Sequence, residues 1–408
     1  MLLTASEYAL FVVAAAPFVY YLLAIYSSAR FFSTEFRHHT PNPDYFPPIS
    51  CLKPVRGLDP DAYENFASFC RQDYPDYEIV FCVDANDPAL PVIQSLIRDF
   101  PQRQIRILYG SGRTAVNDKV SRLVRLTAEA RHELLVISDG DTRVAPGYLR
   151  TVAGAFRDPK VGGATCLYVS PKETSLVQQL QSTGMISDFF ASTLVAWQLD
   201  GIKFMLGQTM AARKKLIAGF GGFERLEDRP ADDLWLGRLI AEQGYEVKLL
   251  PQLVYAVADF QSFRDLLYKR VRWMTVMRMM RPWGHFGLLF TWGLIWALIA
   301  VAAHQSVSVL AAYLGIYLLL RIIMVWLIGI HGMRQKGMWK KIVLIPVWDA
   351  LAFGIWLASF TRNTIRWRGI DYRLQQGMLV AATRKKSDTP RPDSRPRLVH
   401  GVDENPSA

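Results

Sequence analysis

The chain has 408 residues, of which 51% are hydrophobic and 20% are charged. Because soluble domains usually carry about 25% charged residues, this composition excludes a purely soluble protein and a wholly disordered one. The formal net charge of +11 suits an anionic membrane face or a phosphorylated substrate, and since no separate basic run interleaves aromatic residues, we expect no nucleic-acid partner.

The first apolar segment covers residues 8–29 and contains no charged residue. It is long enough to cross a hydrocarbon core of about 30 Å. A cleaved signal peptide would need Lys or Arg before its apolar stretch. Here none precedes the segment, and basic residues follow it instead. We therefore expect residues 1–30 to form an uncleaved anchor of an integral membrane protein. The N-terminus should lie outside, with residue 30 onward in the cytoplasm, at a bacterial inner membrane.

Residues 47–256 alternate short apolar runs with amphipathic stretches. The strand-like runs are residues 49–53, 78–83, 105–109, 134–138, 161–169, 204–210 and 247–250. The helix-like stretches are residues 61–71, 90–100, 116–131, 145–156, 175–197 and 232–243. Such alternation predicts an α/β domain with a mostly parallel sheet covered on both faces. A region of this length is able to bury a core of its own.

Three more apolar blocks lie at residues 286–303, 307–330 and 342–360, so we expect two to three membrane helices within residues 286–360. If the third block crosses completely, the basic residues after it lie outside, against the positive-inside trend. A re-entrant third block avoids this conflict, and the sequence leaves both alternatives open. Residues 361–408 are basic, with a Pro- and Ser-rich end, and are expected to form a largely disordered tail.

Acidic residues stand at the positions where ligands bind in an open α/β sheet, beyond the carboxyl ends of the strands. These residues are Asp84, Asp87, Asp139, Asp141, Asp232 and Asp233. Asp139 and Asp141 are one residue apart after a predicted buried strand, and such a pair is able to hold Mg²⁺ together with a substrate diphosphate. Each acidic piece alone is equally typical of a turn or of a helix N-terminus, so the assignment depends on their combination.

Residues 257–285 mix Leu, Met and Trp with Lys and Arg directly before an apolar block. This pattern predicts an amphipathic helix in the membrane interface, with its cations at the headgroups. Alternatively, an arginine reaches a diphosphate and Trp273 packs under an acceptor. Arg270 and Arg272 lie about 200° apart around a helix, so we expect one to face headgroups and the other the diphosphate.

In chain order, these pieces resemble the pattern D…DxD…D…(Q/R)xxRW of the family 2 and family 21 inverting glycosyltransferases. The likeness is greatest to the ceramide glucosyltransferases and covers roughly residues 8–370. It includes CLKPVRGLDP at 51–60, NDKVSRL at 117–123 and LGQTMAARK at 206–214. The resemblance implies a GT-A domain, which binds a nucleotide-diphosphate sugar, at residues 47–256.

The resemblance assigns a role to each matching residue of the donor site. Asp84 would contact the uridine, with Asp87 as a second candidate for that contact. Lys119 would help to hold the nucleotide. Asp139 would contact the donor, and Asp139 and Asp141 together would bind a divalent cation, Mg²⁺ or Mn²⁺.

The same resemblance assigns the residues that act on the acceptor and the leaving group. Asp233 would be the general base that deprotonates the acceptor hydroxyl. Arg272 would stabilise the pyrophosphate and Trp273 would pack against the acceptor, which leaves Arg270 for the headgroups. Lys269 stands where the family has Gln or Arg, so the role of that position does not carry over.

The implied activity is the inverting transfer of a sugar from a UDP-sugar to a membrane lipid hydroxyl. Glucose is the expected sugar and ceramide the expected lipid. Residues 175–197 and 260–283 would form the membrane-facing entrance for the lipid. Another lipid such as a hopanoid, diacylglycerol or polyprenyl phosphate remains an alternative, because no sequence feature identifies the acceptor. A processive polysaccharide synthase would need more membrane spans, and a non-catalytic scaffold would not need every motif position filled.

Overall fold

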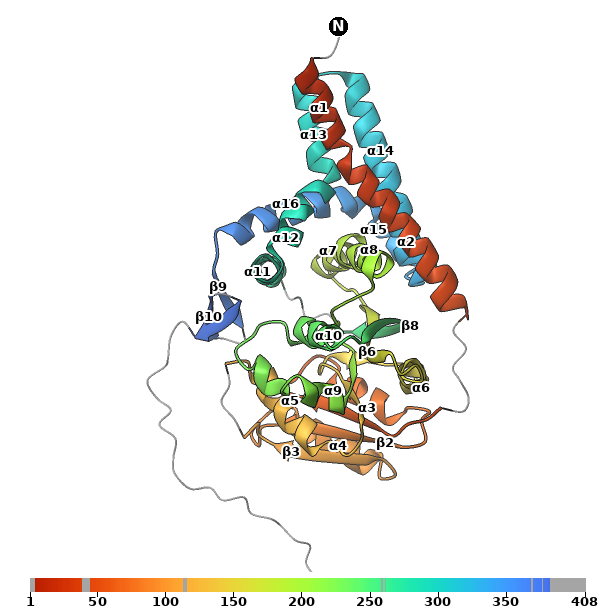
Figure 1. Cartoon of the computed structure of the whole chain (residues 1–408), viewed down its shortest axis with the longest axis vertical. Coiled ribbons are helices and arrows are strands. Elements are labelled where there is room, and N and C mark those ends of the chain that lie inside the picture. Colours follow the sequence, from red (N-terminus) through yellow and green to blue (C-terminus); the bar gives the residue numbers. More distant parts are fainter. Residues whose placement is uncertain are drawn as a thin grey trace, which may run out of the picture.

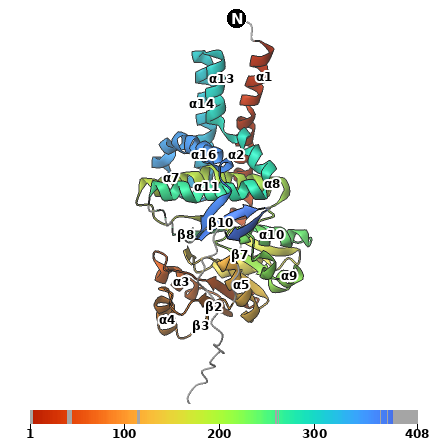
Figure 2. The same ribbon diagram turned by 90° about the vertical axis from the view of Figure 1, so that its left-hand side faces the viewer.

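The computed structural model describes residues 4–38, 45–112, 116–257, 260, 262–367, 370–375 and 377–381. An α/β domain lies at one end of the long axis and a bundle of apolar helices lies at the other (Figure 1). Between the two, a layer of helices runs across the long axis, as the rotated view shows (Figure 2). The molecule therefore has three levels, and the site described below lies where the lower two meet.

The α/β domain is built on one eight-stranded sheet with the order β3-β2-β1-β4-β7-β6-β8-β5. Its strands are β1 (Ile49–Pro54), β2 (Tyr77–Val83), β3 (Gln104–Tyr109), β4 (Leu134–Ile137), β5 (Thr142–Arg143), β6 (Val161–Val169), β7 (Met210–Arg213) and β8 (Glu246–Ala256). Only β7 and β5 run antiparallel to their neighbours. The mostly parallel α/β sheet predicted from the alternating pattern is thus confirmed.

Helices cover the sheet, as its apolar strands require. They are α3 (Ala62–Cys70), α4 (Leu90–Asp99), α5 (Asp118–Glu129), α6 (Tyr148–Ala155), α7 (Leu176–Gly184), α8 (Ala191–Asp200), α9 (Lys214–Gly219) and α10 (Asp232–Glu242). The predicted helix over 175–197 is interrupted by a π-helical turn, η1 (Met185–Phe190). The predicted strand over 204–210 is wrong, because Leu206 and Thr209 pair across a tight turn and the strand begins only at Met210.

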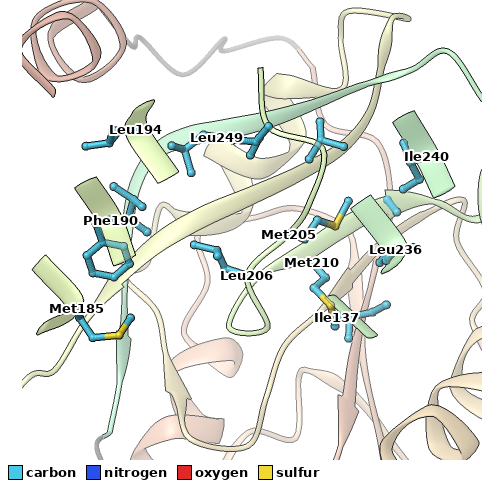
Figure 3. Packing of buried hydrophobic residues seen from close by; sticks show 14 of the residues in the cluster. Ile137, Met185, Phe190, Leu194, Met205, Leu206, Met210, Leu236, Ile240 and Leu249 are labelled. Atoms are coloured by element: carbon cyan, nitrogen blue, oxygen red, sulfur yellow. The ribbon is translucent and has the colours of Figure 1, made fainter. Parts of the chain in front are cut away.

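One hydrophobic core joins the domain to the helices above it. Met185, Phe190 and Leu194 of the η1–α8 segment gather on one side of Leu206 and Leu249 (Figure 3). The same cluster of buried residues continues into α2 (Ala16–His38) and α14 (Val307–Val325). Because protein interiors are close-packed, the domain is held in a defined position relative to these apolar helices.

Three helical segments are long and apolar enough to cross a membrane: Ala5–Phe36, Val307–Gly332 and Met338–Phe360. The first includes α1 (Ala5–Ala14) and α2, and the last ends with α16 (Ile345–Phe360). The expected single span over residues 286–303 is instead bent by 56° between residues 282–291 and 293–304. Only the second part, α13 (Gly293–His304), stands upright beside α1 and α14 (Figure 1).

Part of the expected tail is ordered as a three-stranded antiparallel sheet. Its strands are β9 (Thr364–Trp367), β10 (Ile370–Gln375) and β11 (Met378–Ala381), in the order β11-β10-β9. Residues from 382 onward lie outside the described part of the chain. The Leu379 N–H donates a hydrogen bond of 2.7 Å to the Asp228 carbonyl of the α/β domain. The C-terminal sheet and the domain therefore lie on the same side of a membrane.

This shared side requires an even number of crossings between β8 and β9. The upright helices α13 and α14 supply two, whereas α16 lies across the long axis and packs against α7 and α11 (Phe263–Met280) (Figure 1). Its exposed apolar side chains fit contact with lipid and not with water. They include Val347, Leu357 and Phe360. The geometry thus favours a third block that lies in the interface over one that crosses.

The membrane level is joined to the domain through one buried arginine, Arg321 of α14, which is 2% exposed. Its guanidinium donates to the Asp349 carboxylate of α16 at 3.0 Å, to the Ser187 carbonyl at 2.7 Å and to the Asp188 carboxylate at 3.0 Å. Trp348 completes the cluster by donating its indole N–H to Asp188 at 2.5 Å. A cation at this depth is stable only with such partners.

This arrangement predicts which sites are reached from each side of the membrane. All four native cysteines are buried, so single introduced cysteines can be labelled against a silent background. With an impermeant thiol reagent on intact cells, we expect Thr4→Cys and Ala303→Cys to be labelled. Thr4 caps the N-terminus of α1 and Ala303 lies in the last turn of α13, and these two helix ends meet where Glu7 and His304 are 3.1 Å apart. Lys160→Cys and Gln375→Cys, both exposed, should react only after lysis. Labelling of Gln375→Cys in intact cells would contradict two crossings.

Candidate active site

Three aspartates and a lysine meet beyond the carboxyl ends of the central strands. The Lys119 ammonium lies 2.8 Å from the Asp139 carboxylate and 2.8 Å from that of Asp232. Asp139 follows β4, Asp232 opens α10, and Lys119 is in the first turn of α5, whose N-cap is Asn117. The structure thus brings together residues that are more than 110 positions apart in the sequence.

Gly207 leaves the space into which two of these carboxylates point. A Cβ atom on Gly207 would lie 2.9 Å from Oδ2 of Asp139 and 3.6 Å from Oδ2 of Asp233. Both side chains are therefore directed at the 206–209 turn, the segment that was predicted to be a strand. The turn is fixed to β6, because the Leu206 N–H donates to the Thr165 hydroxyl at 2.9 Å.

The electrostatics of this cluster suit proton transfer near neutral pH. Burial, and next the charge of Asp232, raise the pKa of Asp233 to about 7. Burial disfavours the Lys119 ammonium, but Asp139, Asp232 and Asp233 outweigh it and raise the pKa of Lys119 above its usual value. Lys119 thus stays charged, whereas Asp233 can accept a proton at a physiological pH.

Asp141 and a buried lysine complete the turn after β4. Lys53 of β1 is fully buried and donates to the Ser138 hydroxyl at 2.6 Å and to the Asp139 carbonyl at 3.1 Å. Burial lowers the pKa of Lys53 to about 7. Burial, with the charges of Asp139 and Asp59, raises the pKa of Asp141 to about 7. The carboxylates of Asp59, Asp139 and Asp141 repel one another unless a cation binds between them.

The turn therefore fits a divalent cation that takes few protein ligands. Oδ1 of Asp141 is buried and has no hydrogen-bond partner, which leaves a lone pair for a metal ion. Among the described residues, no group of three or more His, Cys, Asp or Glu side chains is arranged to hold a metal ion. The fit is thus to an ion such as Mg²⁺, which takes one or two carboxylates and completes its shell with water and substrate phosphates.

The second strand end carries a network of charges around Asp84. The Arg122 guanidinium lies 2.7 Å from the Asp84 carboxylate and 3.1 Å from that of Asp118, which is 3.4 Å from Arg56. The Asp84 side chain remains 51% exposed, so it is open to a ligand. Asp87 is different, because its two oxygens accept the backbone N–H groups of Gly57 and Ala89 at 2.8 and 2.9 Å. It is a loop-holding residue, in accord with the turn alternative.

Helix α11 places Arg270 and Arg272 on opposite faces, as their spacing predicts. Arg270 does not face headgroups, since it is half-buried and donates to the side chain and the carbonyl of Gln181 at 2.7 and 3.2 Å. That expectation was wrong because α16 covers this face of α11. Arg272 lines the other face, next to Arg362 and Thr364, and the Trp273 side chain is 39% exposed.

Tyr168 at the end of β6 connects the arginine face with the aspartates. Burial raises the pKa of Tyr168, the charge of Arg270 opposes this, and the charges of Asp233, Asp141 and Asp139 add to it. The layer that contains α11 therefore borders the carboxylate cluster.

Several residues of the site escaped the sequence argument. Arg122 and Asp232 form ion pairs in it, and the charges of Lys53 and Asp59 act on Asp141, yet of these four only Asp232 was noted, as a helix-start residue. A signal was present for Lys53, which interrupts an otherwise apolar strand. A charge at such a position requires a buried partner, and the backbone carbonyl of Asp139, in the DxD motif after β4, is one such partner.

Comparison with known proteins places these features in a family. The model of "Glycosyl transferase family 21" matches residues 9–380. Ceramide glucosyltransferase 1 of Caenorhabditis elegans is 22% identical over 91% of this chain and 82% of its own length. A ceramide glucosyltransferase of Gibberella zeae is 31% identical, over 36% of this chain and 29% of its own.

Among solved structures, the chain is similar to the mannosyltransferase PcManGT from Pyrobaculum calidifontis in complex with GDP-Man and Mn²⁺. The TM-score is 0.57 with 19% identity, over 86% of this chain and 98% of that one. This likeness confirms a glycosyltransferase fold of the predicted GT-A type. The candidate membrane helices rest separately on their length and composition.

The position of Gly207 makes a sharp test of the cluster. We expect Gly207→Ala to lower the catalytic rate by about 10- to 100-fold, because the added methyl group displaces Asp139 and a shift of about 1 Å costs this much. The matched control is Gly154→Ala in α6, where nothing lies within 4 Å of the new methyl group. Steady-state kinetics and thermal unfolding of both variants check this, and normal turnover of Gly207→Ala would argue against the convergence of the two carboxylates.

Proposed function

Because the chain belongs to glycosyl transferase family 21, we propose that it transfers glucose from UDP-glucose to the primary hydroxyl of ceramide, with inversion at the anomeric carbon. The observation that carries this proposal is the cluster in which Lys119 lies 2.8 Å from both Asp139 and Asp232, with Asp233 directed at the same turn as Asp139. Such a displacement needs a base for the acceptor hydroxyl, here Asp233, and a site that stabilises the leaving diphosphate, here the cation-binding turn of Asp139 and Asp141. The names of the relatives support glucose and ceramide.

On the donor side, we assign the diphosphate to the turn of Asp139 and Asp141. These two carboxylates would hold a divalent cation, which when bound offsets the negative charge of the leaving UDP. The Mn²⁺ in the structure of the similar mannosyltransferase supports this assignment. Lys119 keeps Asp139 in place from the opposite side, Arg272 is assigned to the pyrophosphate, and Asp84 to the uridine.

On the acceptor side, we assign Asp233 as the general base. A lipid hydroxyl has a pKa far above 7 and is a poor nucleophile until a base accepts its proton. Asp233 is ionised at and above neutral pH, and its carboxylate points at the 206–209 turn beside Asp139. A single displacement assisted by one base inverts the configuration of the sugar.

We further propose that the lipid enters through the crosswise layer formed by α7, η1, α8 and α11, where Trp273 would pack against it. The orientation would place the domain in the cytoplasm, in accord with the basic residues that follow the first span. The single-cysteine labelling described above tests that orientation. A different lipid with a hydroxyl or phosphate remains the second candidate, because no sequence feature identifies the acceptor.

The activity is tested by the product. We incubate the purified protein with Mg²⁺ or Mn²⁺ and radiolabelled UDP-glucose, UDP-galactose or UDP-N-acetylglucosamine, and offer ceramide or diacylglycerol as the acceptor. We expect label in the lipid phase with UDP-glucose and ceramide, and none after EDTA, because the anionic turn lacks its cation. Label in diacylglycerol would transfer the proposal to the second candidate, a labelled polymer would refute both, and full activity in EDTA would exclude the metal assignment.

The role of Asp233 predicts a particular pH dependence. The value of kcat should fall as the pH drops below about 7, because the base becomes protonated. Asp232→Asn removes a charge that raises the pKa of Asp233, so the acid limb should move to lower pH while much of the rate is retained.

Asp233→Asn cannot accept a proton and should lower kcat by about 10²–10⁴, with donor affinity within a few-fold of wild type. Rates at saturating donor between about pH 5 and pH 9 separate the two variants. If the effects of the two substitutions are exchanged, Asp232 is the base.

A further inference from the structure

The C-terminal sheet β9–β11 is attached to the segment that leads into the base. Leu379 of the edge strand β11 donates its backbone N–H to the Asp228 carbonyl at 2.7 Å. Because a backbone has one N–H group per residue, this group points away from β10. The sheet thus offers its edge to the chain just before α10.

The same segment is held from its other side by the N-cap of α5. Asn117 donates its backbone N–H to the Glu227 carbonyl at 2.9 Å and its side-chain amide to the Arg229 carbonyl at 3.0 Å. Residues 227–229 are therefore clamped between α5, which carries Lys119, and β11.

This clamping is needed because the backbone is strained directly afterwards. Ala231 has a φ of 55°, a left-handed conformation that costs a residue with a Cβ atom about 1–2 kcal/mol. Strained residues persist only where the surrounding structure determines them. Ala231 is followed at once by Asp232 and Asp233, so the direction of both carboxylates depends on this turn.

The other face of the C-terminal sheet is attached to the interfacial helix. Ile365, Tyr372, Leu374 and Leu379 form a buried cluster with Val276 and Met279 of α11 and with Val116, next to Asn117. Arg278 of α11 donates to the Arg362 carbonyl at 2.9 Å and to the side chain of Asn363 at 2.6 Å. The sheet therefore touches both the helix assigned to the pyrophosphate and the turn assigned to the base.

We propose that the β9–β11 sheet is a positioning element of the active site, which couples α11 to the base-bearing turn 227–233 through the Leu379–Asp228 hydrogen bond. Its catalytic consequence rests on the proposed role of Asp233. The sheet sets the direction of Asp233 relative to a substrate held by α11, and it touches no reacting atom itself. Movement of α11 in the interface is transmitted to the base through this contact.

Leu379→Pro tests the hydrogen bond, because proline lacks the N–H and is tolerated on an edge strand where the N–H does not pair within the sheet. Leu379→Ala keeps the N–H and is its partner variant. Val380→Ala, at a residue that is 43% exposed, is the matched control outside the contact. Tyr372→Ala loosens the buried cluster without changing the hydrogen bond, and guards against a proline effect limited to β11.

Two measurements separate this inference from the proposed function. Hydrogen–deuterium exchange of the full-length protein in detergent should be faster at residues 227–233 in Leu379→Pro and Tyr372→Ala, and unchanged in Val380→Ala. This readout does not depend on any activity. In the transfer assay, Leu379→Pro should lower kcat by about 10-fold or more with the KM for the donor within about 3-fold, since misorientation affects the chemical step.

The outcomes are decisive in each direction. Wild-type exchange at residues 227–233 in both Leu379→Pro and Tyr372→Ala overturns the proposed coupling, whatever the protein's activity. Faster exchange with unchanged kcat leaves the contact structural and overturns its positioning role. An increase in donor KM with constant kcat would assign the sheet to donor binding and likewise refute it. Failure of the wild-type protein to transfer sugar overturns the proposed function, while the exchange result still tests the contact.

Discussion

The arrangement of the molecule depends on the ion pairs of Arg321 within the membrane level. A guanidinium in a low-dielectric region is costly unless its donors are satisfied, and here the partners come from α16 and from η1 of the α/β domain. Removing one partner of such a group generally costs about 3–5 kcal/mol, because the remaining charge is left buried. The contact thus holds α14 and α16 against η1, beside the shared hydrophobic core.

Within the domain, the site balances a high density of negative charge with two lysines of different character. Three carboxylates raise the pKa of Lys119, which therefore remains an ammonium. Lys53 lies below the turn of Asp139, where burial lowers its pKa to about 7. The charge that remains uncompensated is concentrated at Asp141 and Asp233, whose pKa values are raised. Burial thus raises the pKa of both the carboxylate that we propose to bind a cation and the one that we propose as the base, in accord with the tendency of perturbed groups to gather at functional sites.

The sequence was informative where a residue's environment is local. Short apolar runs identified β1, β2, β3, β4 and β6, and the carboxyl ends of β2 and β4 identified Asp84, Asp139 and Asp141. It failed where the environment comes from distant chain. Residues 204–210 have the composition of a strand, but Gly207 makes room for carboxylates of two other elements. Helical spacing placed Arg270 and Arg272 on opposite faces, yet only the packing of α16, which is 75 or more residues further along, shows which face is buried.

The crosswise layer would reconcile the proposed lipid acceptor in the bilayer with the proposed base in the domain. Helix α13 rises only about 18 Å at 1.5 Å per residue, less than a hydrocarbon core of about 30 Å. The apolar helices at its foot must therefore lie within the near leaflet, as the exposed Trp283, Val347 and Phe360 also indicate. This immersion brings Trp273 and the region of Tyr168 to the depth of lipid headgroups. The hydroxyl of a lipid would then move only a short way out of the bilayer, and the lipid's apolar chains would stay in it.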